Sequence, residues 1–236
     1  MSRPRLLDLF CGEGGASVGY HAAGFDVVGV DIKPQPLYPF FFVQADATAF
    51  AVRGCALGGQ SFTFDAIHAS PPCQAHTGMS NRWRGKGTKA DTHVSLIALM
   101  RARLEDAGVP WVLENVPGAA RFMRDPIVLT GEMFGLRVHR PRLFESNVLI
   151  LAPDKPAVRR DTIGVYGKAH DGRLLWRRKD GSEQRAARTL ERAREAMGMP
   201  WASWRGCCEA VPPAYTEFIG RALMQAVTAR RASLGD

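Results

Sequence analysis

The first 70 residues alternate between apolar runs and one stretch of helical periodicity. "ASVGYHAAG" (16–24) has small and apolar residues at helical spacing and ends at Gly24, a candidate C-cap. Four apolar runs predict strands: "LLDLF" (6–10), "FDVVGVDI" (25–32), "FFFVQADATAF" (40–50) with its end at Asp46, and "FTFDAIHAS" (62–70). This order predicts an α/β protein with a Rossmann-like, doubly wound sheet.

The pattern continues through the second half of the chain. Residues 75–91 are polar, basic and rich in glycine, which predicts a loop. The rest predicts a helix over 92–108 closed by Gly108, a strand over 110–116, a turn and a strand within 127–147, a helix over 186–199, and a helix that starts after Pro212–Pro213 and runs to 233. Between residues 161 and 185, two β-like runs surround Asp171–Gly172, a pair that favours a hairpin turn.

The positive charge of the chain is concentrated in one segment. The formal net charge is +8, from 31 Lys and Arg against 23 Asp and Glu. Residues 137–194 hold 15 of the basic and 7 of the acidic residues, so the remainder, with 16 of each, is neutral. A local basic excess beside a neutral domain indicates a polyanionic partner such as nucleic acid, and a solvated charged face is the alternative.

The five cysteines show no metal-ligand spacing, and two of them are adjacent. An odd number without C-x-x-C spacing predicts free thiols in a reducing compartment and no metal site, so we expect a cytoplasmic protein. No apolar run has the length of a membrane span, and the N-terminal apolar stretch is short and carries Asp8, which is unlike a signal peptide.

Chemically useful side chains fall at the ends of the predicted strands. Asp31 and Asp46 end the second and third, Cys73 follows the fourth, and Glu114 lies near the end of the fifth. Carboxyl ends of parallel strands line the ligand crevice of an open sheet. The thiol sits in "HASPPCQ" (68–74), where two prolines make a stiff turn that positions the next side chain. A positioned nucleophile and a packed thiol are the two interpretations of Cys73.

The turn "CGEGG" (11–15) indicates a nucleoside ligand without phosphates. It lacks the full G-x-G-x-x-G pattern, and the acidic Glu13 disfavours a pyrophosphate. Asp31 at the end of the second strand suits ribose hydroxyls. A ligand with a ribose, an adenine and a positive charge fits this turn, and S-adenosylmethionine is such a ligand.

Five motifs together resemble one enzyme family. "DLFCGEGG", "SPPCQ", "ENV", "RPRLF" and "AVPPAYTEFIG" are similar, in content and order, to the motif set of the DNA cytosine-C5 methyltransferases. The resemblance covers most of the chain outside about 148–187, and it is closest to the short phage-type members, which implies action on DNA in a bacterial host cell. It implies a catalytic, S-adenosylmethionine-binding domain of residues 1–147 and 188–236, with a small basic target-recognition region over 148–187 that contains the hairpin.

The resemblance implies a role for each matched residue. Cys73 attacks C6 of a flipped cytosine, Glu114 binds N3 and the exocyclic amine, and Arg142 binds O2. Asn115 holds the turn, and Arg140 supports the site or the backbone. The implied cofactor residues are Phe10, Gly12, Glu13, Gly14, Gly15, Asp31 on the ribose, Ile32 on the adenine ring, Asp46 on the adenine amine, Ala47, Pro72 and Ala210. The expected DNA contacts are Gln74, Arg82, Arg84, Lys86, Lys89, Arg173, Arg177 and Arg178.

Several residues keep a structural alternative. Glu114 could cap a helix, Asp46 could serve a turn, and Trp176 could be hairpin core or a stacking surface for bases. We expect ordinary packing or polar contacts for the remaining candidates, namely Cys11, Cys55, His68, His76, Cys207 and Cys208.

The chain departs from the family pattern in three places. Val138 stands where a glutamine is usual, and Glu209 where an asparagine is usual, which puts a supporting contact and the link to the cofactor pocket in doubt. The recognition region is short, so it reads a very short site, reads almost nothing, or depends on an auxiliary DNA-recognition partner.

The sequence thus predicts a monomer that methylates C5 of cytosine in double-stranded DNA with S-adenosylmethionine. An RNA cytosine methyltransferase and a catalytically silent DNA-binding relative are the rivals. No membrane partner and no metal are expected.

Overall fold

A seven-stranded sheet forms the centre of the protein in the computed structural model, which describes residues 2–57, 60–72, 96–154, 161–167, 172, 174–177 and 183–235. Its strand order is β3-β2-β1-β6-β7-β9-β8. The strands are β1 (Arg5–Leu9), β2 (Asp26–Asp31), β3 (Phe41–Gln44), β6 (Ala66–Ala69), β7 (Trp111–Asn115), β8 (Ile127–Leu129) and β9 (Arg142–Ser146). This mixed α/β architecture confirms the predicted fold class.

Neighbouring strands from β3 to β7 are parallel, and β9 is antiparallel to both β7 and β8. The buried strands read as nearly continuous apolar runs because helices cover both faces of a parallel sheet. The order reverses beside β1, where β2 lies on one side and β6 on the other. Such a switch point places a ligand crevice at the carboxyl ends of β1 and its neighbours.

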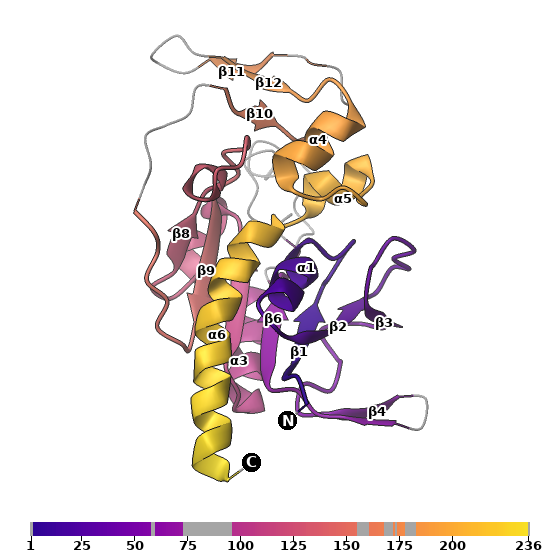
Figure 1. Cartoon of the computed structure of the whole chain (residues 1–236), viewed down its shortest axis with the longest axis vertical. Helices are drawn as coiled ribbons and strands as arrows, with labels where there is room; N and C mark the ends of the chain where they lie inside the picture. The colour runs from indigo at the N-terminus through magenta and orange to yellow at the C-terminus, as the bar shows by residue number, and fades with distance from the viewer. Residues whose placement is uncertain are drawn as a thin grey trace, which may run out of the picture.

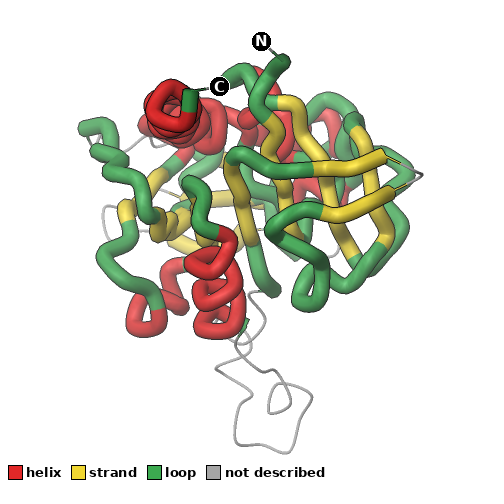
Figure 2. Tube along the Cα trace, turned by 90° about the horizontal axis from the view of Figure 1, so that it is seen from below, coloured by secondary structure: helices red, strands yellow, loops and turns green. Residues whose placement is uncertain are grey.

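Two hydrophobic layers hold the helices on the sheet. On one face α1 (Gly15–Ala22) and α6 (Pro213–Leu234) pack together over Leu6, Val27 and Val112. On the other face α3 (Ile97–Ala107) covers Leu7, Val28 and Leu113. Side chains alternate between faces along each strand, so both sets come from the same strands. Figure 1 shows α6 running alongside the central sheet, with both chain termini at one end, and Figure 2 views the sheet from that end.

A smaller lobe lies beyond the carboxyl ends of the parallel strands (Figure 1). It contains the sheet β10-β12-β11, with β10 (Ile163–Gly164), β11 (Leu174–Arg177), β12 (Glu183–Ala186), and the helices α4 (Leu190–Met197) and α5 (Trp204–Glu209). Its core is a third cluster that includes Val138, Val165, Met197 and Cys207. The hydroxyl of Thr189 caps α4 by accepting the backbone N–H of Arg192.

The predicted hairpin at Asp171–Gly172 is wrong. β10 pairs with β12 in parallel, and β11 pairs with β12 in antiparallel fashion, so β10 and β11 are not neighbours. The two segments on either side of Gly172 therefore belong to opposite edges of a sheet whose middle strand comes later in the chain. A two-residue turn signal cannot reveal that a third strand inserts between two candidates.

Other boundaries differ from the predicted ones. The third strand ends at Gln44, two residues before Asp46. The run 62–70 divides at Asp65, because β5 (Gln60–Phe62) pairs with β4 (Cys55–Leu57) in a separate hairpin, and only β6 joins the central sheet. Asp65 interrupts the run by accepting the Arg5 N–H and pairing with Arg231. Residues 127–147 hold two strands and the short 3-10 helix η4 (Gly131–Phe134), and α6 begins at Pro213 itself.

Neither α5 nor the 3-10 helix η3 (Pro117–Phe122) was expected from the pattern, because both are too short for a periodic signal. No helix in the described part of the chain combines the length and apolarity needed to cross a bilayer.

Candidate active site at the carboxyl edge of the sheet

Glu114 and Arg142 form an ion pair at the edge where the parallel strands end. Arg142 Nε lies 2.9 Å from Glu114 Oε1. Glu114 is near the end of β7, and Arg142 begins β9, so the antiparallel register places the start of one strand beside the end of the other. Arg142 also donates from Nη1 to its neighbour's carbonyl, Pro141 O, at 3.0 Å. Strand pairing therefore brings together two residues that the motifs indicated separately.

The Glu114 carboxyl is buried, with 6% of the residue exposed. Burial raises its pKa, while Arg142, the Ser70 hydroxyl and Arg140 oppose the rise. Because desolvation outweighs these partners, the group exchanges protons more readily near neutral pH than an ordinary carboxylate does. The alternative that Glu114 caps a helix has no support among its described contacts, which are made with strand and turn residues.

Asn115, the next residue along β7, ties this strand to the proline turn. Its Nδ2 donates to Pro71 O at 3.1 Å, and its Oδ1 accepts the Val116 N–H at 2.9 Å. Asn115 is 1% exposed. The first contact fixes the backbone where the chain leaves β6 for Cys73, and the second fixes the backbone where the chain leaves β7. Cys73 and Gln74 themselves lie outside the described residues.

Arg140 has a structural position rather than one on the surface of the site. It is 1% exposed, has a left-handed backbone φ of 36°, and donates to three backbone carbonyl oxygens. The acceptors are Ala210 O at 2.9 Å, Cys208 O at 2.7 Å and Val165 O at 3.2 Å. Arg140 thus joins the strand edge to α5 and to the small lobe, which agrees with the backbone-supporting alternative for this residue.

The glycine-rich turn after β1 curls over the start of α1. Phe10 has a φ of 63°, and Gly12 and Gly14 have φ values of 51° and 85°, all left-handed. A Cβ on Gly14 would lie 2.8 Å from Pro39 Cδ, whereas one on Gly12 would meet no atom within 4 Å. Gly12 therefore presents its backbone to open space, which suits close approach of a ligand. Gly15 begins α1 and packs closely against Val211 O.

Asp31 stands beside this turn at the end of β2. Its Oδ2 accepts the Gly12 N–H at 3.1 Å, and its Oδ1 accepts the Lys33 N–H at 2.9 Å. The next residue, Ile32, is a large apolar side chain that is 64% exposed. A carboxylate on a fixed turn next to an exposed aliphatic surface is a suitable arrangement for a ribose and an adenine ring.

The remaining predicted cofactor residues lie in different environments. Asp46 is exposed and accepts from the backbone and hydroxyl of Thr48, and these bonds lower its pKa. Ala47 is 2% exposed, Pro72 is exposed and Ala210 is partly buried. The turn alternative for Asp46 therefore describes its observed contacts, and its cofactor role stays a prediction.

The Glu13 carboxylate is engaged elsewhere. Its two oxygens accept from the backbone N–H of Ser203 at 2.7 Å and from the Ser203 hydroxyl at 2.5 Å, and Trp201 donates to its carbonyl. Glu13 thus anchors the start of α5 to the glycine-rich turn. A role of its backbone toward a cofactor stays a prediction.

The residues around the turn fit S-adenosylmethionine by their chemistry. The open space above Gly12, the exposed Ile32 and the carboxylates of Asp31 and Asp46 offer a backbone cradle, an apolar surface and acceptors for hydroxyl and amino groups. No group of three or more His, Cys, Asp or Glu residues that could hold a metal ion occurs within the described ranges.

A polar cluster beneath the site was missed by the sequence analysis. Asp8 in β1 is 1% exposed, accepts a hydrogen bond from the Ser17 hydroxyl, and burial raises its pKa to about 7. Ser17 also lies 2.8 Å from the Tyr38 hydroxyl. His68, expected to make ordinary polar contacts, is completely buried, and burial lowers its pKa to about 3. The sequence signal for this cluster is Asp8 itself, a charged residue inside the apolar run "LLDLF".

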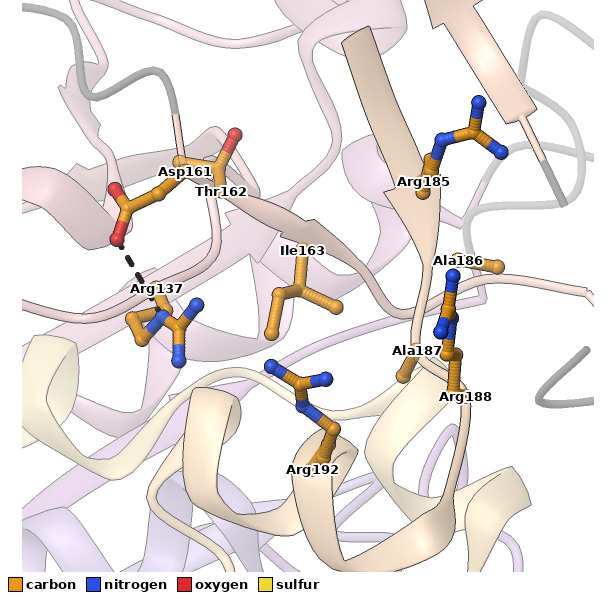
Figure 3. A pocket seen from close by; sticks show the side chains of 9 residues that line it. All are labelled: Arg137, Asp161, Thr162, Ile163, Arg185, Ala186, Ala187, Arg188 and Arg192. Atoms are coloured by element: carbon orange, nitrogen blue, oxygen red, sulfur yellow. Dashed lines mark ion pairs between the residues drawn. The ribbon is translucent and has the colours of Figure 1, made fainter. Parts of the chain in front are cut away.

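The small lobe holds a basic pocket of about 310 Å³ between β10, β12 and α4. Four arginines line it: Arg137, Arg185, Arg188 and Arg192 (Figure 3). Arg137 pairs with Asp161 at 3.5 Å, whereas no carboxylate pairs with Arg188 or Arg192 in the described part of the chain. The Arg137 carbonyl accepts the Ile163 N–H at 2.6 Å, so the pocket is fastened to the segment that leads to Arg140 and Arg142.

Most of the predicted DNA contacts lie outside the described residues: Gln74, Arg82, Arg84, Lys86, Lys89, Arg173 and Arg178, together with His76. Arg177 belongs to β11, but its side chain and that of Trp176 are not described. The two residues that depart from the motif pattern, Val138 and Glu209, both lie within the described residues. Val138 is 2% exposed in the small-lobe core, and Glu209 forms an ion pair with Arg205 at 3.0 Å.

No family model and no curated protein matches this chain. Among solved structures, one designated a DNA modification methyltransferase encoded within an E. coli prophage has a TM-score of 0.60 at 17% identity, covering 95% of this chain and 99% of that one. A methyltransferase from Entamoeba histolytica has a TM-score of 0.50 at 12% identity, with 98% of each chain covered. At these identities the likeness concerns the fold, so the chain has the fold of methyltransferase structures.

Proposed function

We propose that this protein transfers a methyl group from S-adenosylmethionine to C5 of cytosine in double-stranded DNA. The observation that carries the proposal is the Glu114–Arg142 pair at 2.9 Å, next to a proline turn that Asn115 holds and that leads to Cys73. The five ordered motifs and the fold support it. The division into a catalytic part, 1–147 and 188–236, and a recognition part, 148–187, belongs to the same proposal.

The buried pair suits the recognition of a cytosine ring edge. Arg142 supplies N–H donors for the O2 carbonyl, and Glu114 accepts from the exocyclic amine and shares a proton with N3. The raised pKa of Glu114 favours this shared proton at neutral pH. A base inside a duplex cannot reach a buried carboxyl, so the nucleotide must be flipped out of the stack.

The thiolate of Cys73 then adds to C6 of the base and breaks the C5–C6 double bond. The electron pair moves to C5, which forms the new bond to the methyl carbon. S-adenosylmethionine, when bound, would supply that methyl group from its sulfonium sulfur, which would keep the electron pair of the broken S–CH3 bond and leave as a neutral thioether. Loss of the C5 proton to water returns an electron pair to the ring, and the C6–S bond breaks to release Cys73. Glu114 and Arg142 stabilise the charge that develops on the ring during these steps.

The basic pocket gives the small lobe a candidate contact with the nucleic-acid backbone. Arg188 and Arg192 have no carboxylate partner among the described residues, and the pocket is joined to the Arg140–Arg142 segment through Arg137. Guanidinium groups bind phosphate oxygens with geometry that a lysine cannot reproduce. A phosphate flanking the flipped base is the ligand that this position and chemistry suit.

Labelled methyl transfer to unmethylated duplex DNA tests the proposal, with base-resolution mapping of the product. We expect label at C5 of cytosine, loss of label in Cys73→Ala, and retained label in Cys55→Ala, a cysteine of the separate β4–β5 hairpin. Label on RNA alone would contradict the DNA substrate and favour the RNA rival. No label, with cofactor and DNA both bound, would contradict catalysis and favour a silent DNA-binding protein.

A further inference from the structure

Strand register places three polar side chains, those of His68, Ser70 and Glu114, on one face of the sheet. Asp8 in β1 pairs with His68 in β6, and Ala69 pairs with Leu113 of β7. Ser70 therefore lies beside Glu114 on the neighbouring strand. Residues two apart share a face, so His68 and Ser70 lie on the same face as Glu114, the face that α1 covers.

The hydrogen bonds join these residues into a continuous chain. The Tyr20 hydroxyl, on α1, lies 2.9 Å from His68 Nδ1. His68 Nε2 lies 2.7 Å from the Ser70 hydroxyl oxygen. The register brings Ser70 beside Glu114, and the Ser70 side chain acts on this carboxyl as a hydrogen-bond donor that lowers its pKa. Tyr20 and His68 are fully buried, so water does not compete for the contact between them, whereas Ser70 is partly buried.

Only one arrangement of protons satisfies every member when Glu114 is ionised. A carboxylate only accepts, so Ser70 must donate to it. The Ser70 oxygen then accepts from His68, which requires the proton on Nε2. A neutral imidazole has one donor and one acceptor, so Nδ1 accepts from the Tyr20 hydroxyl. Each hydrogen bond in the series from Tyr20 to Ser70 is therefore donated toward Glu114.

We infer that Tyr20, His68 and Ser70 are positioning residues that orient and stabilise the Glu114 carboxylate through the Ser70 hydroxyl. Arg142 of β9 holds the same carboxylate, so donors from two segments of the chain act on it. A carboxyl held by two donors needs less reorganisation when it meets its ligand. The identity of that ligand as cytosine rests on the proposed function. The hydrogen-bond chain from Tyr20 to Glu114 does not depend on that function.

Charged groups from several elements face Glu114 and set the background for a test. Arg142 and Arg140 favour its ionised form, whereas Asp8 from β1 and burial disfavour it. The Tyr20 hydroxyl is uncharged because burial raises its pKa well above the ordinary value. Removing the Ser70 donor leaves both arginines in place, so a change in the pKa of Glu114 reports on the hydrogen-bond chain rather than on the arginines.

The test is a titration of Glu114 by 13C NMR in protein labelled at glutamate Cδ, with its signal assigned from its absence in Glu114→Gln. We expect the midpoint to rise by about one pH unit in Ser70→Ala, because a hydrogen bond to a charged acceptor is lost. Ser70→Thr keeps a hydroxyl and should restore the wild-type midpoint. Ser146→Ala is the matched control, since that hydroxyl donates to Trp111 O instead.

The hydrogen-bond chain from Tyr20 to Glu114 predicts that the effects of two substitutions on the Glu114 titration midpoint do not add. His68→Phe should raise the Glu114 midpoint in a wild-type background and leave it unchanged in Ser70→Ala, because its effect passes through the serine. Tyr20→Phe removes one oxygen and should give a smaller rise in the same sense, which keeps the test open if His68→Phe does not fold. An unchanged midpoint in Ser70→Ala, or equal effects of His68→Phe in both backgrounds, would overturn the inference.

This measurement needs no substrate, so its outcome is separate from that of the proposed function. A protein that methylates nothing but shows the expected shifts would lose the proposed function and keep the positioning chain. In an active protein, the limb of the pH–rate profile that reports Glu114 should move upward in Ser70→Ala by the same interval as the NMR midpoint.

Discussion

Asn115 Nδ2 donates to Pro71 O at 3.1 Å, and this bond joins the strand that carries Glu114 to the turn that leads to Cys73. The two candidate catalytic side chains come from segments 41 residues apart in the sequence, so their relative position depends on such cross-strand contacts. A fixed geometry between a nucleophile and a ring-binding acid is a large part of catalysis by positioning.

Asn115→Ala is expected to lower kcat for methyl transfer by about 100-fold, because a misplacement near 1 Å has effects of that size. Cofactor affinity, measured by calorimetry, should be unchanged. Asn147→Ala is the control, since Asn147 binds the backbone at the other end of β7, through Trp111 N and Val109 O. An equal loss of kcat in the control would show that strand stability, rather than the turn, is responsible.

Arg140→Met is expected to destabilise the protein by about 3–5 kcal/mol, because it removes a buried guanidinium and leaves three carbonyl oxygens, one buried and two partly buried, without this donor. Urea unfolding monitored by circular dichroism measures the free energy. Arg205→Ala removes an exposed ion pair and should change that free energy by less than about 1 kcal/mol. A small effect of Arg140→Met would contradict the bridging role that we assign to this residue.

Ile32→Ala is expected to weaken S-adenosylmethionine binding by about tenfold without changing stability, since 64% of the residue is exposed and its loss leaves little internal packing undone. Leu149→Ala, at a residue that is 83% exposed, serves as a control for loss of an exposed aliphatic side chain. Calorimetric titration and a melting curve measure both quantities. Unchanged affinity in Ile32→Ala would remove Ile32 from the cofactor site.

Asp8 should make the protein less stable as pH rises from about 4 to about 7. Its folded pKa of about 7 lies above the unfolded value of 3.8, so its contribution is fully present below pH 3.8 and is lost as pH rises to 7. Asp8→Asn removes this dependence. The free energy of unfolding of the variant, relative to wild type, should therefore increase by a few kcal/mol between pH 4 and pH 8.

Urea titrations at both pH values measure this difference, and His68 contributes equally to the two proteins because it is unchanged. Asp26→Asn, which alters an exposed carboxylate, should show no such pH-dependent gain. A constant difference between Asp8→Asn and wild type across this range would mean that Asp8 stays ionised when buried.

Arg188→Ala and Arg192→Ala should each weaken duplex binding and reduce the slope of log K against log salt concentration by about 0.9, if each arginine meets one phosphate. Arg230→Ala near the C-terminal end of α6 is the control for loss of a surface arginine. Fluorescence anisotropy over a salt series measures both quantities. Free inorganic phosphate competing at low concentration would indicate a separate anion site, and an unchanged slope would exclude the pocket from the interface.

The sequence determined the order of elements and the chemistry at their ends. Apolar runs bounded by glycine and proline predicted β1, β2 and β7 close to their observed bounds, and Gly108 marked the end of α3, because buried parallel strands and long helices have strong local patterns. Asp31 and Glu114 were expected at strand ends for the same reason. The motif order could indicate a function because it depends only on residue identity along the chain.

Tertiary structure decided which of these side chains meet. The pairing of β7 with an antiparallel β9 brings Arg142 to Glu114, and the register of β6 against β7 brings Ser70 beside the same carboxyl. Local pattern also failed where a distant strand intervened, as when β12 inserted between β10 and β11. Register and strand order arise from the packing of whole faces, so no short window of sequence contains them.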